Sequence, residues 1–370
     1  MIKKKLTKVT TFFLIYLFVF AVADILFSNF IYKQDIQNNC YKYTENFYYL
    51  KKNCYAKEKW LKNSLSYSVH TDNNGFRFSG KKNSKNFDKI VTFSGGSFTY
   101  GMGMDYNNTF VGMIESSNKE LNIINLGLAG YSTSAFNYQL KKLISNKMYP
   151  KKIFVALDVL DVSNETSRWG EKIGYEHPVL IKKEVINVEN VDKVKEFKRK
   201  NFKGSRLLAR SVNNFFRYLR FYFTTLEKQP DKSIKTPWGS FLYTNIEDID
   251  KSLWEPLSFE KGILKIKKNI GEISKLAQSI NAEFYIIIYP WPDALQYGQN
   301  NFNWEEFADN LCLDVSCTKL INLFPDFRNI KENSKNWIRE IYIKDDMHLT
   351  KFGHKIVSKK ILKVGFDQSF

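Results

Sequence analysis

A serine, a histidine and an aspartate in this sequence have the types and settings that nucleophilic acyl transfer requires. Ser97 follows two glycines in the run from Ser94 to Gly101, and Asp345 and His348 are three residues apart near the C-terminus. A serine hydroxyl becomes a nucleophile when a histidine base lies within hydrogen-bond reach and an acid orients that base. We therefore predict Ser97 as nucleophile, His348 as base and Asp345 as the orienting acid.

Two nearby residues offer alternatives at this candidate site. Asp346 could be the acid instead, but its two-residue spacing from His348 is less suited to a shared face. His354 lies six residues beyond His348, inside a predicted helix, where a surface or capping role is expected. We keep Asp345 with His348 because a three-residue spacing in a turn lets both side chains face one point.

A second glycine-containing run, from Asn125 to Ser132, follows a short apolar stretch. A strand that ends in glycines can bring an uncovered backbone N–H close to a developing oxyanion. The N–H group of Ser97 and an N–H group of this run are therefore candidates for an oxyanion hole.

Together these runs resemble the SGNH/GDSL hydrolase family over roughly residues 70–160 and 280–365. Ser97 matches the nucleophile of the family's first block, Gly130 the oxyanion glycine of the second, and Asp345 with His348 the last block. The resemblance implies a flavodoxin-like three-layer α/β/α fold with a parallel sheet and an ester-cleaving Ser-His-Asp site. Membrane-anchored members linked to cell-surface polysaccharide are suggested by further stretches, namely Asn74–Arg77, Thr109–Phe110, Tyr289–Pro292 and Trp304–Phe327.

The sequence departs from the family pattern in two blocks. Gly96 stands where the Asp of the Gly-Asp-Ser motif is expected, and Leu160 falls at the position of the third block's Asn, a donor to the oxyanion. Asp161 follows, and its charge would repel an oxyanion, whereas Asn164 is a replacement donor that the sequence alone does not place. Loss of one such donor typically costs about 10²–10³ in turnover.

Apolar runs alternate with helical patterns through the chain, which is typical of a parallel sheet covered on both faces. Strands are predicted at 89–94, 121–125, 153–158 and 283–289, and helices at 109–119, 134–146, 262–280 and 350–364. Residues 164–256 interrupt this rhythm and are predicted to be a helical insertion. We expect a signal-anchor segment at 1–32, a lead-in at 33–85 and the hydrolase domain at 86–370.

The N-terminus predicts export from the cytoplasm. Four lysines among the first eight residues precede an apolar run from Val9 to Ile31, long enough for a membrane span with the body outside, periplasmic or at the cell surface. Ala21-Val22-Ala23 leaves a cleaved signal peptide as the alternative. We favour the uncleaved transmembrane anchor because the apolar character continues beyond that point.

The four cysteines fall into two local pairs, Cys40 with Cys54 and Cys312 with Cys317. Short-loop disulfides of this kind suit an oxidising compartment. Free thiols are the alternative, and a zinc site is not expected because neither pair has Cys-x-x-Cys spacing or a close histidine. We predict neither metal nor cofactor.

The net charge of +18 over 370 residues is spread along the sequence without a nucleic-acid motif. We therefore predict no nucleic-acid partner, and expect an acylated polysaccharide or another ester as substrate. An exported serine esterase acting on ester groups, in particular O-acetyl groups, is the predicted function. An O-acyltransferase using the same site, or a catalytically degraded glycan-binding or scaffold protein, remains an alternative, and the sequence does not indicate the oligomeric state.

Overall fold

The computed structural model describes residues 2–26, 39–60, 66–80, 89–172, 174–181, 257–299, 302–344 and 346–367. The chain divides into two compact units, one comprising Met1–Ile36 with Ile186–Lys232 and the other Gln37–Val185 with Ser233–Phe370. The second unit carries the candidate site. Most of the predicted insertion, residues 182–256, lies outside the described residues, and so does Asp345.

An eight-stranded sheet forms the centre of the second unit, with strand order β12-β11-β8-β6-β7-β5-β4-β3. The five strands from β12 to β7 are parallel, as the alternating sequence pattern predicts. They are β6 (Ile90–Ser94), β7 (Asn122–Asn125), β8 (Pro150–Leu157), β11 (Glu283–Ile288) and β12 (Lys319–Asn322). Strand β6 pairs in parallel with both β7 and β8. The carboxyl ends of these three strands therefore meet at one edge, where ligands bind in open parallel sheets.

The sheet is mixed rather than wholly parallel, which corrects the sequence-based expectation. Strand β5 (Arg77–Phe78) pairs antiparallel with β7, and β4 (Ser66–Thr71) and β3 (Tyr55–Lys59) continue the sheet in antiparallel fashion. Much of the predicted lead-in at 33–85 therefore belongs to the same sheet as the parallel strands. Lys59 ends β3, and Trp60 follows it directly.

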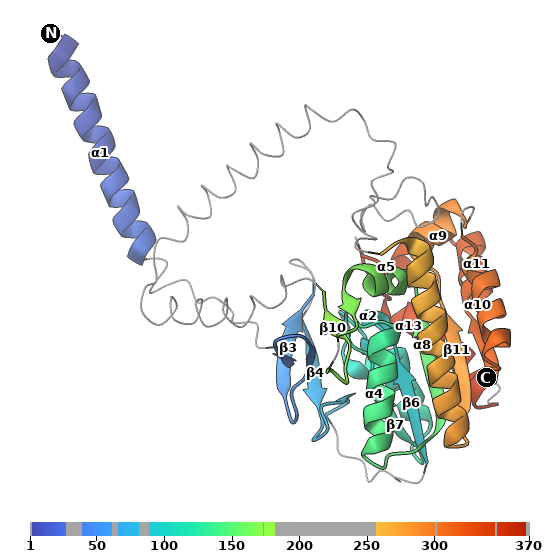
Figure 1. The fold of residues 1–370 in the computed structure, drawn as a ribbon. Helices are drawn as coiled ribbons and strands as arrows, with labels where there is room; N and C mark the ends of the chain where they lie inside the picture. The colour runs from blue at the N-terminus through green and yellow to red at the C-terminus, as the bar shows by residue number, and fades with distance from the viewer. Residues whose placement is uncertain are drawn as a thin grey trace. The chain divides into compact units, whose positions relative to one another are not determined.

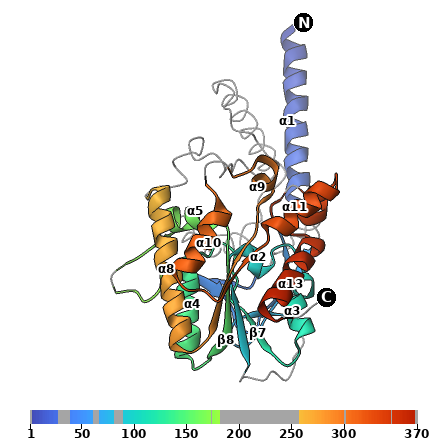
Figure 2. The same ribbon diagram turned by 90° about the vertical axis from the view of Figure 1, so that its right-hand side faces the viewer.

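Helices cover both faces of the sheet (Figures 1 and 2). Helices α4 (Thr133–Ser145), α5 (Leu160–Ser167) and α8 (Phe259–Ser279) pack together on one side, and α3 (Phe110–Ser117) packs with α13 (Lys351–Gly365) on the other. The remaining helical segments are α2 (Ser97–Tyr100), η2 (Tyr106–Asn108), α9 (Pro292–Tyr297), α10 (Trp304–Asp314), α11 (Phe324–Asn333) and α12 (Trp337–Ile341). This arrangement is the three-layer α/β/α architecture expected from the sequence.

A two-stranded antiparallel ribbon precedes the main sheet, formed by β1 (Tyr41–Tyr43) and β2 (Tyr48–Leu50). The disulfide Cys40–Cys54 joins the start of this ribbon to the start of β3, and Cys312–Cys317 closes a short loop after α10. Both are the pairings that the sequence analysis expected. A second small ribbon, β9 (Trp169–Gly170) with β10 (Val179–Leu180), forms where the insertion was predicted to begin.

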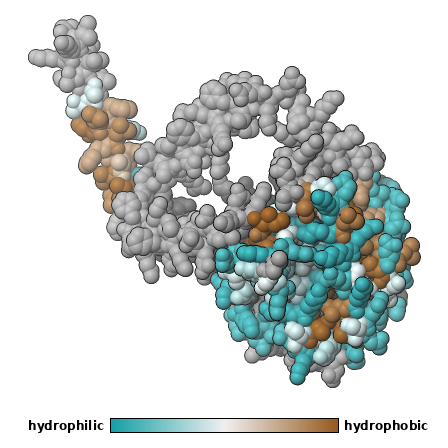
Figure 3. Space-filling model, in the orientation of Figure 1, coloured by the Kyte–Doolittle hydropathy of each residue, from teal (hydrophilic) through white to brown (hydrophobic). Residues whose placement is uncertain are grey.

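Helix α1 (Ile2–Leu26) is the described part of the first unit. Its side chains from Phe12 to Phe18 are exposed, and Figure 3 shows this apolar stretch in brown. By length and hydropathy, none of the helices in the described ranges qualifies as a membrane span. Residues 27–31 of the segment predicted over Val9–Ile31 lie outside the described residues.

Candidate active site

Ser97 is the first residue of α2, directly after the two glycines that end β6. A Cβ atom on Gly95 would lie 2.1 Å from Thr99 Oγ1 and 3.2 Å from Ala156 Cβ, so the chain can turn this tightly only with glycine there. As the first residue of a helix, Ser97 has no acceptor for its N–H within α2. The turn thus presents both a hydroxyl and a backbone donor at the carboxyl edge of the sheet.

His348 joins Ser97 to a carboxylate. Ser97 Oγ lies 2.7 Å from His348 Nε2, and His348 Nδ1 lies 2.8 Å from Asp346 Oδ2. The histidine and the aspartate are 3% and 5% exposed. A serine bonded to an imidazole whose other nitrogen faces a buried carboxylate is the arrangement that activates a hydroxyl for acyl transfer.

The carboxylate in contact with His348 is that of Asp346, whereas the sequence analysis preferred Asp345, which lies outside the described residues. The argument from spacing assumed a turn in which a three-residue separation lets both side chains face one point, whereas Tyr342 and Leu349 form an antiparallel bridge on either side of this loop. Ile343 N–H donates to His348 O, and Asp346 N–H donates to Ile343 O. This loop brings the carboxylate two residues before the histidine onto His348 Nδ1.

Hydrogen bonds keep Asp346 ionised despite its burial. Burial alone would raise the pKa of Asp346, but the bond and charge of His348, the Met347 N–H and the Trp60 indole lower that pKa below its usual value. Met347 N–H donates to Oδ1 at 2.9 Å, and Trp60 Nε1–H donates to Oδ2 at 2.7 Å. A charged carboxylate holds His348 with Nδ1 protonated and leaves Nε2 to accept the proton of Ser97.

Gly130, the predicted oxyanion donor, has a backbone conformation that favours glycine. Its φ is +76°, and a Cβ there would lie 1.8 Å from Arg168 Nη1 and 2.7 Å from Tyr48 Oη. The carbonyl of Gly130 accepts from Trp169 Nε1 at 2.9 Å. Within the described part of the chain no hydrogen bond engages the Gly130 N–H, so this donor is available to an incoming oxyanion.

Asn125 holds the loop that carries Gly130 against the serine turn, a role that the sequence analysis missed. Its amide donates to Thr99 O at 2.9 Å, and its side-chain oxygen accepts from Gly127 N–H at 2.8 Å. The signal was present in the sequence as a polar residue that ends an apolar strand.

The third-block residues form a helix start rather than a donor site. Asp158 Oδ1 accepts from the N–H of Leu160, the first residue of α5, and Asp161 Oδ2 reaches back to accept from Asp158 N–H. Burial raises the pKa of Asp161 well above its usual value. Asn164 is buried further along α5, where its carbonyl accepts from Arg168 N–H, and no contact of Asn164 with Ser97 or Gly130 occurs among the described residues.

Asp158 itself borders the active site, which the sequence analysis did not predict. A Cβ on Gly96 would lie 4.0 Å from Asp158 Oδ2, and Tyr289 O–H donates to the same oxygen at 3.1 Å. Burial raises the pKa of Asp158 to about 6, partly offset by hydrogen bonds from Leu160 and Tyr289 and by the charge of His348. Asp158 therefore changes charge near pH 6.

Asp158→Asn is expected to shift the acid limb of the pH dependence of kcat/KM to lower pH, by up to about one pH unit. The ionised carboxylate stabilises the imidazolium of His348, and the neutral amide removes that stabilisation. The measurement is kcat/KM for p-nitrophenyl acetate between pH 4 and 8, with Asp309→Asn, an exposed change on α10, as control. An unshifted acid limb would contradict this electrostatic coupling.

Trp60 adds a contact to the catalytic acid from the antiparallel edge of the sheet. Its ring meets His348 edge-on at 5.2 Å between centroids, and its indole N–H donates to Asp346. No local pattern marks Trp60, since it is separated from Asp346 by 286 positions. We assign Trp60 as a positioning residue for the acid.

Trp60→Phe should lower kcat about tenfold, because a hydrogen bond to a charged group is worth about 1.5–3 kcal/mol, while leaving KM for p-nitrophenyl acetate within about twofold. The Phe ring keeps the packing against His348 and removes only the donor. Trp60→His, which can retain an N–H donor, should recover part of the lost kcat. An equal loss in both variants would instead indicate a packing role.

His354 is a buried structural residue and not a surface one. It is 1% exposed, and its Nδ1 accepts from Phe110 N–H at 3.2 Å, at the start of α3. Burial lowers the pKa of His354 to about 3, and the charges of Arg77 and His348 act in the same direction. The neutral ring therefore caps α3, which agrees with the expected capping role and corrects the expected exposure.

His354→Ala is expected to destabilise the fold by about 2–4 kcal/mol, because it leaves a buried N–H unpaired and a cavity. The wild-type histidine must stay neutral when folded but takes a proton near pH 6.5 when unfolded. Its contribution is therefore complete above pH 6.5 and is lost progressively as the pH falls toward 3. The free energy of unfolding is measured in urea at pH 8 and pH 5 for His354→Ala and for Lys355→Ala, an exposed control. The difference between the two variants should be smaller at pH 5.

No group of three or more histidine, cysteine, aspartate or glutamate side chains able to hold a metal ion occurs in the described ranges. The residues around Ser97 supply a nucleophile, a base, an oriented acid and two candidate backbone donors.

Comparison with known proteins gives matches only among solved structures. No family model matches the chain, and no curated protein sequence does. One similar structure is a member of the lipolytic G-D-S-L family from Veillonella parvula, at 11% identity, with 76% of this chain and 100% of that chain covered and a TM-score of 0.42. Another is an acetyl xylan esterase, at 14% identity, with 74% and 98% covered and a TM-score of 0.41.

A third similar structure is a catalytic mutant of an acetylxylan esterase from Geobacillus stearothermophilus, at 8% identity, with 76% of this chain and 95% of that chain covered and a TM-score of 0.38. Likeness at this level carries no argument about activity. The function has to follow from the contacts around Ser97.

Proposed function

We propose that this chain is an exported serine esterase of the SGNH/GDSL type that removes acyl groups, in particular O-acetyl groups, from a polysaccharide. The observation that carries the proposal is the continuous hydrogen-bond chain from Ser97 Oγ through His348 to Asp346. The two disulfides support export, because such bonds persist in oxidising compartments.

The reaction follows from this geometry in two steps. His348 Nε2 takes the proton of Ser97 Oγ as the oxygen attacks the ester carbonyl, and the N–H groups of Ser97 and Gly130 stabilise the resulting oxyanion. The C–O bond of the sugar ester breaks, and His348 returns the proton to the departing sugar hydroxyl. Water then attacks the acyl-serine with His348 again as base, releasing the carboxylic acid and the free serine.

The absence of a third-block amide at Leu160 leaves two backbone donors for the oxyanion. We therefore expect slower turnover than a site with a third donor would give, by about 10²–10³. If a sugar hydroxyl replaces water in the second step, the same site acts as an acyltransferase. Adding free oligosaccharide to the assay distinguishes the two acceptors, because a transferase would acylate the oligosaccharide.

The proposal is tested by covalent labelling with a fluorophosphonate and by release of p-nitrophenol from p-nitrophenyl acetate. Peptide mapping of the labelled protein should place the adduct on Ser97. A wild-type protein that neither labels nor turns over the ester would remove the support for catalysis and favour a glycan-binding protein on the same fold.

A further inference from the structure

A cavity of about 350 Å³ opens beside the candidate active site, in the size range of ligand sites. Its walls are mostly aromatic, and a few polar groups stand among them. We call it the tyrosine groove and define it by six of its lining residues: Tyr41, Tyr43, Tyr48, Tyr67, Trp60 and Arg168.

Strand alternation explains why the tyrosines gather on one side. Tyr41 and Tyr43 are two residues apart on β1, and Tyr43 pairs with Tyr48 on β2, so all three lie on one face of the ribbon. Their rings contact one another at centroid distances of 5.6 to 6.3 Å. Such mutual packing fixes the ring orientations before any ligand arrives.

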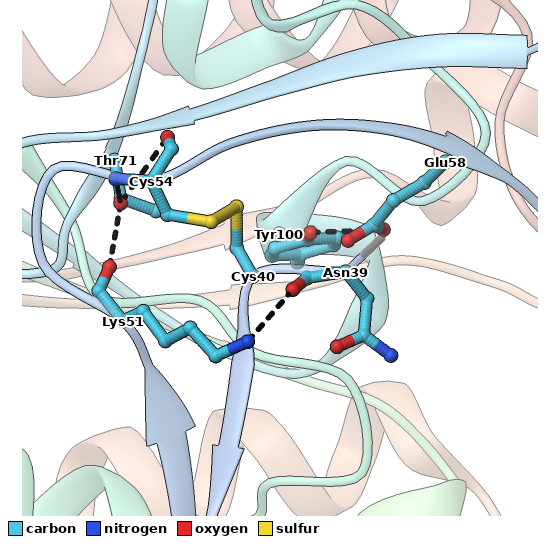
Figure 4. The surroundings of a disulfide bond; sticks show 7 residues. All are labelled: Asn39, Cys40, Lys51, Cys54, Glu58, Thr71 and Tyr100. Atoms are coloured by element: carbon cyan, nitrogen blue, oxygen red, sulfur yellow. Dashed lines mark hydrogen bonds between the residues drawn. A yellow bond between two sulfur atoms is a disulfide. The ribbon is translucent and has the colours of Figure 1, made fainter. Parts of the chain in front are cut away.

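The Cys40–Cys54 disulfide holds this aromatic face against the main sheet (Figure 4). Thr71 reinforces the link by donating to Lys51 O and accepting from Cys54 N–H. Behind the rings, Glu58 Oε2 accepts from the hydroxyls of Tyr67 and Tyr100. The groove is thus built on cross-linked strands rather than on a loop.

The groove reaches the catalytic residues from two directions. Trp60 in its wall contacts His348 and Asp346, and Ala129 in its wall directly precedes Gly130. Met102, also in the wall, donates its N–H to Ser97 O at 3.0 Å. A ligand in the groove therefore lies next to the nucleophile, the base and the oxyanion loop.

Two polar groups of the groove suit a polyhydroxylated ligand. Glu58 is buried and lines the groove, and its Oε1 has no hydrogen-bond partner within the described residues. Arg168 hydrogen-bonds Tyr48 and approaches Gly130 O at 3.4 Å, and it makes no ion pair in the described part of the chain. An unpaired acceptor and a forked donor among aromatic faces match the hydroxyls and the C–H faces of a sugar.

We propose that the tyrosine groove binds a sugar ring of the substrate and so presents an ester on that ring, or on its neighbour, to Ser97. This inference rests on the proposed esterase function and adds the site that recognises the carbohydrate. The groove selects the sugar, whereas the Ser97 site cleaves any acetyl ester that reaches it.

The test compares two substrates in three tyrosine variants. Tyr43→Ala removes a ring from the groove, Tyr43→Phe keeps the ring, and Tyr49→Ala removes an exposed ring from the opposite face of the same ribbon. The substrates are p-nitrophenyl acetate, which has no sugar, and a set of O-acetylated xylo-, gluco- and galacto-oligosaccharides. Acetate release gives kcat and KM for each pair.

Tyr43→Ala should lower kcat/KM for the preferred acetylated oligosaccharide about tenfold, mainly through KM, because the variant removes a packed aromatic face from the groove. Hydrolysis of p-nitrophenyl acetate should stay within about twofold, and Tyr43→Phe and Tyr49→Ala should resemble wild type on both substrates.

Two results would overturn the sugar site and leave the esterase proposal standing. In one, wild type cleaves p-nitrophenyl acetate but prefers none of the oligosaccharides. In the other, Tyr43→Ala loses the same activity on both substrates. Failure of wild type to turn over any ester, with no label on Ser97, would overturn the esterase proposal and the sugar site with it.

Discussion

Ser97→Ala is expected to reduce ester hydrolysis by at least about 10⁴-fold and to abolish fluorophosphonate labelling. Among the described residues, the Ser97 hydroxyl is the nucleophile that contacts His348 Nε2, at 2.7 Å. Ser97 sits at a turn and is partly exposed, so its loss removes little packing. Thermal melts should therefore stay close to wild type while acetate release from p-nitrophenyl acetate falls to the background rate.

A matched control for this change is available three residues earlier. Ser94 is fully buried, and its hydroxyl has no hydrogen-bond partner within the described residues. Ser94→Ala should keep wild-type turnover, and the double variant Ser97→Ala with His348→Ala should lose no more activity than Ser97→Ala alone, because the residues act as one unit. Wild-type turnover in Ser97→Ala would exclude it as the nucleophile.

Asp346→Asn is expected to lower kcat by about 10³–10⁴, the second largest effect among these predictions. The amide keeps the size of the side chain but no longer carries the charge that holds His348 Nδ1 protonated. The amide can instead turn its N–H₂ toward the imidazole and favour the wrong tautomer. Labelling of Ser97 should slow in parallel, while the fold is preserved.

Asp345→Asn is the matched control, since it makes the same chemical change one residue away. The bond from His348 Nδ1 to Asp346 Oδ2 leads us to expect turnover within about twofold of wild type. The comparison is made by steady-state kinetics at pH 8 on both variants. A large loss in Asp345→Asn with Asp346→Asn unaffected would restore the assignment favoured by sequence spacing.

The sequence alone determined the parts of the site that depend on local chain geometry. Two glycines before Ser97 predict a tight turn after a buried strand, and Gly130 predicts a backbone that other residues adopt with strain. The predicted strands at 89–94, 121–125, 153–158 and 283–289 correspond to β6, β7, β8 and β11. Apolar runs bounded by turn residues predict the positions of these strands, because each strand is buried on both faces.

Spacing along the chain was a poorer guide where a loop folds back on itself. Asp345 and Asp346 are adjacent in sequence, and the choice between them depended on an assumed turn that suits a three-residue spacing. In the structure Tyr342 bridges Leu349, and the carboxylate on His348 Nδ1 is that of Asp346. His354 likewise looked exposed in a helix whose buried face is decided by its packing against α3.

The tertiary structure alone decided which distant groups support the site. Trp60 and Asp346 are 286 positions apart, and Tyr48 and Ala129 are 81 apart, so no periodicity relates them. The antiparallel extension through β5, β4 and β3 brings these groups to the edge where β6 ends. Local sequence indicates which residues form turns and which are buried. Contacts between residues far apart in the chain depend on how the strands pair, and that pairing is a property of the whole sheet.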